Sequence, residues 1–245
     1  MLNLLITGKS GRMGQAILQA AAAEPAVAVV STHDAGENLA KAMVPAGCVI
    51  DFTIHKFTLE VVAEALKHGT HLVIGTTGHT DEERAAIAEA AKTLPIVFAS
   101  NYSVGVNLLF WLTQKAASVL HQDRFDMEVV EMHHKHKIDA PSGTARRLLE
   151  ILNEETGTSY KEDIAHGRVG NVGPRKPREI GMHTLRGGDV VGDHTVIFAA
   201  DGERFELTHK ASSRLTFAAG AVRAAVWLQD KPPGLYDMQD VLGLK

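Results

Sequence analysis

The chain has 245 residues, a length typical of one or two domains. Its 25 Lys and Arg residues against 29 Asp and Glu residues leave a formal net charge of −4, which argues against a surface built mainly for nucleic acid or anionic membranes. Apolar residues make up 45% and charged residues 22%, so disordered and fibrous classes are excluded.

The single cysteine and the N-terminal segment indicate in which cellular compartment the protein is expected. Cys48 rules out an internal disulfide, which is typical of a reducing compartment, and its apolar neighbours predict a buried, inert thiol. The chain starts directly on a strand pattern with no signal-peptide features, and no segment approaches the roughly 18 apolar residues of a membrane helix. We therefore expect a soluble, cytoplasmic protein that binds neither membrane nor nucleic acid.

Short apolar runs alternate with helical patterns over the first hundred residues. Strands are predicted at 2–7, 27–31, 49–53, 71–74 and 96–99. Helices are predicted at 13–23, at 58–68, and from the capping-box pair Thr80 and Glu83 to a point before Pro95. Repeated β-α-β units with continuous apolar strands indicate an α/β fold, a Rossmann-like parallel sheet covered on both faces.

The pattern changes after Asn107, where helices and strands no longer alternate. A helix (107–121), a strand (125–131), a histidine-rich loop and a helix that Ser142 can cap (145–155) precede a loop over 157–178. Strands follow at 180–185, 189–199 and 205–209, with a turn at Asp201-Gly202, and a helix at 216–228 comes last. These elements predict a second, α+β domain with a largely antiparallel or mixed open sheet.

A glycine-rich turn directly follows the first strand and opens the first helix. Gly8, Gly11 and Gly14 have the spacing G-x-x-G-x-x-G, one residue longer than the common dinucleotide fingerprint. Glycines at such a turn let backbone N–H groups approach a pyrophosphate at the positive end of the helix. Because strand, turn and helix come in the required order, dinucleotide binding is favoured over a turn that serves packing alone.

The end of the second strand offers an acidic residue for the adenosine ribose. Asp34 lies about 20 residues beyond the glycine turn, where a carboxylate accepts from the ribose hydroxyls and favours NAD. Lys9 and Arg12 place two cations beside the same pocket and could offset the repulsion between Asp34 and the 2′-phosphate of NADPH. The alternative is that both are ordinary solvated charges of the loop. The preference between NADH and NADPH therefore stays open at this point.

Two further polar turns follow apolar strands, where a doubly wound sheet binds its ligand. The first is Gly75-Thr76-Thr77-Gly78 and the second is Ser100-Asn101-Tyr102-Ser103. Either turn could contact the nicotinamide ribose and carboxamide, and a purely structural turn is an alternative for each.

The segment from Glu131 to Thr144 contains three histidines and two lysines within five residues. A zinc site is disfavoured, because no further carboxylate or histidine stands at helical spacing. The favoured interpretation is an acid–base site for an anion, with histidine as proton donor and lysines attracting carboxylates. Ser142, Gly143 and Thr144 would form a second anion cradle at a helix start, so we expect a small substrate with more than one carboxylate. A solvated basic loop is the alternative.

Several segments together resemble the 4-hydroxy-tetrahydrodipicolinate reductase (dihydrodipicolinate reductase) family of bacterial lysine and diaminopimelate biosynthesis. The resemblance runs in order along essentially the whole chain, and its most specific part is the histidine-rich segment. The matching segments are Gly8–Gly14, Asp51-Phe52-Thr53, Gly75–Gly78, Glu131–Thr144 and His209-Lys210-Ala211-Ser212-Ser213-Arg214.

The resemblance implies an NAD(P)H-dependent oxidoreductase that transfers hydride to a cyclic imine dicarboxylate. From the spacing of the histidines we expect no metal. The resemblance further implies that His133 is the proton donor and Lys137 its catalytic partner, and that His134, Ser142, Gly143 and Thr144 hold the substrate carboxylates. The cofactor residues it implies are Gly8, Lys9, Ser10, Gly11, Arg12, Met13, Asp34, Gly75, Thr76, Thr77, Gly78, Ser100, Asn101, Tyr102 and Ser103.

The resemblance also implies a domain division and an assembly. Residues 1–104 and 215–245 would form the dinucleotide-binding domain, and residues 105–214 the substrate-binding and oligomerisation domain. The family's usual assembly is a homotetramer built through the second domain's sheet. Competing interpretations are a dehydrogenase for another small dicarboxylate, a nicotinamide-dependent sensor without catalysis, and a zinc hydrolase.

Overall fold

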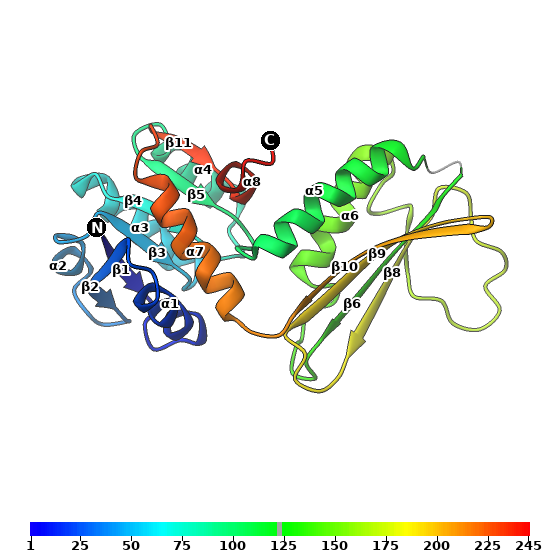
Figure 1. Ribbon diagram of the computed structural model, residues 1–245, viewed down its shortest axis with the longest axis horizontal. Coiled ribbons are helices and arrows are strands. Elements are labelled where there is room, and N and C mark those ends of the chain that lie inside the picture. Colours follow the sequence, from blue (N-terminus) through cyan, green and yellow to red (C-terminus); the bar gives the residue numbers. More distant parts are fainter. Residues whose placement is uncertain (122–123) are drawn as a thin grey trace. The chain divides into compact units, whose positions relative to one another are not determined.

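The computed structural model describes residues 1–121 and 124–245, which form two compact units (Figure 1). The first unit comprises Met1–Val104 and Arg214–Lys245, and the second comprises Gly105–Ser213. Within the described ranges, every helix is too short or too polar to cross a membrane.

A six-stranded parallel sheet is the centre of the first unit. Its strand order is β11-β5-β4-β3-β1-β2. The strands are β1 (Leu2–Thr7), β2 (Val27–His33), β3 (Cys48–Asp51), β4 (His71–Ile74), β5 (Pro95–Phe98) and β11 (Gly234–Tyr236). The predicted Rossmann-like sheet is confirmed, and its central strands are buried on both faces because most of their side chains are apolar.

Helices cover both faces of this sheet. One face packs against α1 (Arg12–Ala22), α7 (Leu215–Leu228) and α8 (Met238–Leu242). The other packs against α2 (Leu39–Met43), α3 (His55–His68) and α4 (Asp81–Ala90). Helix α4 begins with the predicted capping box between Thr80 and Glu83. With both faces covered, the carboxyl ends of the strands are the edge of the sheet where a ligand can bind.

The second unit is a mixed five-stranded sheet with two helices on one face. Its strand order is β10-β9-β6-β8-β7. The strands are β6 (Asp126–His133), β7 (Ile164–His166), β8 (Ile180–Arg186), β9 (Gly192–Ala200) and β10 (Glu203–Ala211). Helices α5 (Val104–Val119) and α6 (Gly143–Thr156) pack on the apolar face. The predicted mixed sheet is confirmed, with β6 parallel to β8 and antiparallel to β9.

The sequence patterns did not predict four short elements. These are α2, β7, β11 and α8, each with three to five residues. Strand β7 lies within 157–178, where a loop without regular structure was expected. A segment this short shows too little hydrophobic periodicity to identify, and its structure depends on its tertiary partner, as when β11 pairs with β5.

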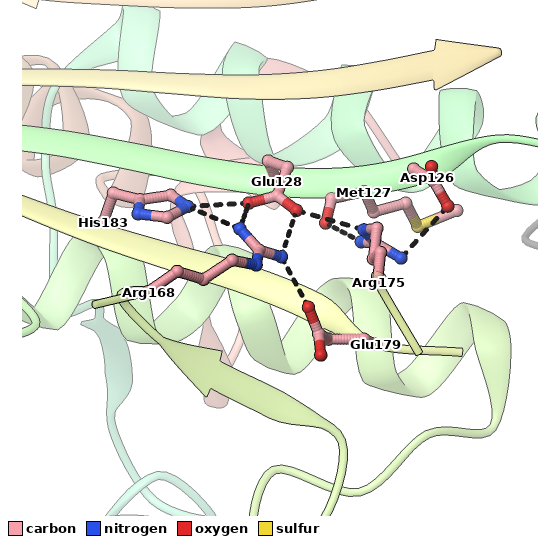
Figure 2. A network of polar contacts seen from close by, with 7 residues as sticks. All are labelled: Asp126, Met127, Glu128, Arg168, Arg175, Glu179 and His183. Carbon is pink, nitrogen blue, oxygen red and sulfur yellow. Dashed lines mark hydrogen bonds and ion pairs between the residues drawn. The ribbon is translucent and has the colours of Figure 1, made fainter. Parts of the chain in front are cut away.

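A network of charged side chains ties the segment after β7 to the sheet (Figure 2). The carboxylate of Glu128 accepts from both terminal nitrogens of Arg168, at 3.0 and 2.7 Å, and from Arg175 Nε at 3.2 Å. It also contacts His183 Nε2 at 2.7 Å, while Arg168 reaches Glu179. Burial opposes the charge of Glu128, but the bonds from Arg168 and His183 outweigh it and lower its pKa to about 2.

The depressed pKa of Glu128 predicts a loss of stability in acid. A carboxyl with a lower pKa in the folded state stabilises the protein fully above the ordinary value of 4.5 and loses that contribution as the pH falls towards 2. We expect Glu128→Gln to lower the melting temperature at neutral pH, and the difference from wild type to narrow over this interval. Thermal unfolding measured at several pH values, with the exposed Glu162→Gln as control, tests this; a difference independent of pH would contradict it.

Candidate active site

The glycine turn between β1 and α1 fits a dinucleotide pyrophosphate. Gly8 has a positive φ of 67°, and a Cβ on Gly14 would lie 2.0 Å from the carbonyl oxygen of Gly8. This close approach of turn and helix tolerates only glycine at position 14. Helix α1 begins after Gly11, and no side chain caps it. Its first N–H groups are therefore suited to an anion, and the positive end of the helix dipole favours one.

Two carboxylates stand at the end of β2, where the adenosine ribose is expected. Asp34 Oδ1 accepts from Ser10 N at 3.3 Å. Glu37 accepts from Asp34 N at 2.8 Å through one oxygen and from Lys9 Nζ at 2.5 Å through the other. The hydrogen bond from Lys9 lowers the pKa of Glu37, which is thus ionised at neutral pH. Lys9, one of the two cations considered for a 2′-phosphate, is paired with Glu37.

The two polar turns after β4 and β5 are only partly available to a ligand. The Thr76 hydroxyl is buried and donates to Asp51 Oδ2 at 3.0 Å. The Tyr102 hydroxyl is also buried and lies 2.9 Å from Ile74 O and 3.0 Å from Val97 O. Thr76 and Tyr102 could thus contribute only backbone atoms to a cofactor site. Exposed residues in these turns are Thr77, Gly78 and Ser100.

The imidazole of His133 is held by a buried carboxylate on the same strand. His133 Nδ1 lies 2.5 Å from Glu131 Oε2, and both side chains lie on the same side of β6 because they are two residues apart. Burial opposes the charge of Glu131, but bonds from His133 and Arg186 outweigh it and lower its pKa to about 2. An ionised carboxylate only accepts hydrogen bonds, so Nδ1 carries a proton and Nε2 is the nitrogen left to face a substrate.

Arg186 connects this carboxylate to the histidine-rich loop. Its two terminal nitrogens donate to the two oxygens of Glu131, both at 2.9 Å, in the bidentate geometry that arginine makes with carboxylates. One of them also donates to the carbonyl oxygen of Asp139 at 2.7 Å. The Asp139 carboxylate in turn accepts from Lys137 Nζ at 2.8 Å. The predicted partners His133 and Lys137 are therefore connected through Glu131, Arg186 and Asp139.

Ser142 caps α6 and is bonded on three sides within the second unit. Its hydroxyl accepts from Ala145 N at 3.2 Å and lies 3.1 Å from His194 Nε2, while its N–H donates to Glu131 Oε1 at 3.2 Å. Burial lowers the pKa of His194 to about 3, so this ring is neutral at physiological pH. Ser142 is almost wholly buried, and the start of α6 at Gly143 and Thr144 is the more accessible part of the predicted carboxylate cradle.

The remaining predicted histidines occupy different surroundings. His134 follows the end of β6, with its ring 6.2 Å from that of the exposed His136. His209, which begins the last of the segments that carry the family resemblance, pairs with His194 across β9 and β10. In the part of the chain that the structure describes, no group of three or more His, Cys, Asp or Glu side chains has the arrangement of a metal site.

Sequence reasoning assigned no role to four side chains in these sites. Glu131 could have been identified from strand alternation, because a residue two positions before His133 shares its face. Arg186 and His194 could not, because they approach through the pairing of β6 with β8 and β9. Glu37 could not be identified from the sequence, because its pairing with Lys9 depends on the conformation of the turn after β2.

Comparison with protein families places both units in one family. The family described as "Dihydrodipicolinate reductase, N-terminus" matches residues 2–102. The family described as "Dihydrodipicolinate reductase, C-terminus" matches residues 105–242.

Curated proteins of the same family are similar to this chain along its full length. A 4-hydroxy-tetrahydrodipicolinate reductase of Akkermansia muciniphila is 62% identical, with 100% of this chain and 99% of the relative covered. Proteins of the same name from Chromobacterium violaceum and Anaeromyxobacter dehalogenans are 48% and 47% identical, with at least 99% of each chain covered.

Solved structures show the same fold at low identity. A dipicolinate-bound dihydrodipicolinate reductase from Paenisporosarcina sp. TG-14 matches with a TM-score of 0.82 and 22% identity, and covers 98% of both chains. A probable dehydrogenase from Thermotoga maritima matches with a TM-score of 0.64 and 10% identity, over 99% of this chain and 93% of the other. From the two family matches and the full-length relatives, the chain belongs to the dihydrodipicolinate reductase family of oxidoreductases.

Proposed function

We propose that this chain reduces 4-hydroxy-tetrahydrodipicolinate to tetrahydrodipicolinate in lysine and diaminopimelate biosynthesis, with His133 as the proton donor. The observation that carries the proposal is the hydrogen bond between His133 and buried Glu131, next to the start of α6. The overall conversion adds one hydride and one proton and breaks the bond between the ring carbon and the 4-hydroxyl group, which leaves as water. A cytoplasmic location belongs to the proposal, since the buried thiol of Cys48 suits a reducing compartment.

Each unit contributes a different part of the reaction. The glycine turn, Asp34 and the turns after β4 and β5 hold the dinucleotide, and reduced nicotinamide, when bound, supplies the hydride. In the second unit, His134, Gly143 and Thr144 hold the substrate carboxylates, assisted by the α6 dipole.

Proton transfer is assigned to the outward nitrogen of His133. Glu131 fixes the ring with Nε2 facing outward, so that a proton on Nε2 can be delivered to the ring carbon that becomes electron-rich on hydride transfer. Lys137 adds positive charge beside the substrate and stabilises the negative charge that develops there. Asp139 holds the Lys137 ammonium until the substrate carboxylate competes for it.

We propose that NADH is the preferred cofactor. The ribose position has two carboxylates, Asp34 and Glu37, which would repel the 2′-phosphate of NADPH. Lys9, which could neutralise that phosphate, is paired with Glu37 and would have to leave it. Asp34 can instead accept from both ribose hydroxyls of NADH.

We also propose that the second unit mediates assembly into a homotetramer. Helices α5 and α6 pack on one face of its sheet. The opposite face carries Val130, Met132 and Ile197, which are only half-buried in the single chain, and Leu185, which is 49% exposed. A second copy of this chain would bury these apolar side chains and gain hydrophobic free energy.

The assay of the proposed reaction follows the loss of reduced-nicotinamide absorbance on adding the condensation product of aspartate semialdehyde and pyruvate. We expect turnover with wild type and a decrease of about 10²–10⁴ in His133→Gln, because general acid catalysis is worth about that factor. NADH affinity should stay unchanged in the variant. His136→Gln, in the same loop but exposed, is the matched control. Near-normal turnover in His133→Gln would refute the acid assignment, and no turnover in wild type would refute the function.

The cofactor preference is tested by Glu37→Gln, which frees Lys9 for the 2′-phosphate. We expect kcat/KM for NADPH to rise relative to NADH by a few-fold, about the factor that an exposed ion pair contributes. The gain should shrink at high salt. Glu89→Gln, which breaks the exposed pair with Lys92 on the outer side of α4, is the control. An unchanged cofactor ratio would show that Glu37 does not influence the choice.

The assembly is tested by Ile197→Glu, which places a charge in the apolar sheet face. We expect wild type to have the mass of four chains in light scattering after size exclusion, and the variant to form smaller species. Lys161→Glu, at an exposed position outside this face, should leave the mass unchanged. A wild-type mass of a single chain would refute the assembly.

A further inference from the structure

Asp51, at the carboxyl end of β3, is wholly buried and takes no part in the chemistry assigned above. Its oxygens accept from four threonine hydroxyls. Oδ1 accepts from Thr7 at 2.7 Å and from Thr53 at 2.6 Å, and Oδ2 accepts from Thr58 at 2.6 Å and from Thr76 at 3.0 Å. A carboxylate has about four lone-pair positions, so these hydroxyls saturate it.

Within the described residues, none of the ion pairs involves Asp51. Burying a carboxylate without a cation is costly unless hydrogen bonds compensate the lost hydration. The four hydroxyls provide that compensation, and charge-assisted bonds of this kind are stronger than neutral ones. Thr58 lies in the first turn of α3, where the helix dipole also favours negative charge.

The four donors come from different segments that meet at the ligand edge of the sheet. Thr7 is the last residue of β1 and directly precedes the glycine turn, and Thr76 lies in the turn after β4. Thr53 contacts both segments. Its N–H donates to the Thr76 hydroxyl at 2.9 Å, and a Cβ on Gly8 would lie 3.0 Å from its methyl group. One carboxylate therefore connects the glycine turn to the turn after β4.

We propose that Asp51 is a positioning residue for the nicotinamide dinucleotide, acting through the threonine hydroxyls that it orients and without touching the cofactor. Asp51 keeps the pyrophosphate turn and the Thr76–Gly78 turn in the relative position that one dinucleotide requires. The inference rests on the proposed function only in assuming that this unit binds the dinucleotide.

Asp51→Asn keeps the size of the side chain but replaces one acceptor oxygen by a donor group. We expect the dissociation constant for NADH to rise at least tenfold, with KM for NADH rising in parallel. At saturating NADH, KM for the dicarboxylate should change less than twofold, because the substrate carboxylates are held by the second unit. NADH binding is titrated directly by its fluorescence, and circular dichroism with thermal unfolding reports the fold.

Thr58→Val tests the same carboxylate without altering it. The change is nearly isosteric and removes one hydrogen bond to Oδ2 from a helix residue outside the cofactor turns. We expect the NADH dissociation constant to rise several-fold, and Thr58→Ser, which keeps the hydroxyl, to restore it. Thr113→Val is the matched control, since Thr113 is equally buried but belongs to the second unit. It should change the melting temperature alone.

The outcomes separate this inference from the proposed function. If wild type binds NADH and both Asp51→Asn and Thr58→Val bind it as tightly, with only the melting temperature lowered, the carboxylate is purely structural and the inference is wrong. If Asp51→Asn does not fold, Thr58→Val with its serine rescue decides the question. If wild type itself binds neither NADH nor NADPH, the cofactor half of the proposed function fails.

Discussion

The hydrogen-bonded carboxylate of Glu131 is the constraint on which the substrate side depends. It is wholly buried, and His133, Arg186 and the N–H of Ser142 all bond to it. Through these three bonds it orients the proposed acid, fixes the arginine that holds the histidine-rich loop, and places the first turn of α6. Removing any one donor would leave a buried charge without full compensation, which is far more costly than losing a surface ion pair.

The two units compensate their buried carboxylates in different ways. In the second unit Glu131 faces an arginine and an imidazole, so the positive charge of Arg186 balances its own. In the first unit the Asp51 carboxylate accepts, among the described residues, from neutral threonine hydroxyls. Hydroxyls fix geometry without introducing a group that titrates near neutrality, which suits a carboxylate whose role is to hold turns. The positive field for the pyrophosphate then comes from the start of α1.

Local patterns in the sequence account for most of the fold. The runs at β1 and β4 are apolar enough to require burial on both faces, and the Thr80 capping box marks α4. The features that the sequence did not predict depend on pairing between segments that are distant along the chain. Strand β11 is identified only by its pairing with β5, and Arg186 reaches Glu131 from 55 positions away because β8 lies beside β6 in one register. Thr76 looked like a ligand group, but its hydroxyl turns inward to a carboxylate that local sequence could not place.

The ring of His194 lies beside that of His133, and its surroundings bear on which of the two rings can act as the proposed acid. The His133 and His194 rings lie 5.1 Å apart at a steep angle, so two positive rings would repel each other. Burial, and then the charge of His133, lowers the pKa of His194 to about 3, and its Nε2 lies at the hydroxyl of Ser142. His194 therefore stays neutral, while the carboxylate of Glu131 lies against His133 alone. Of the two rings, His194 is held neutral by burial, which leaves His133 for the proposed role of proton donor.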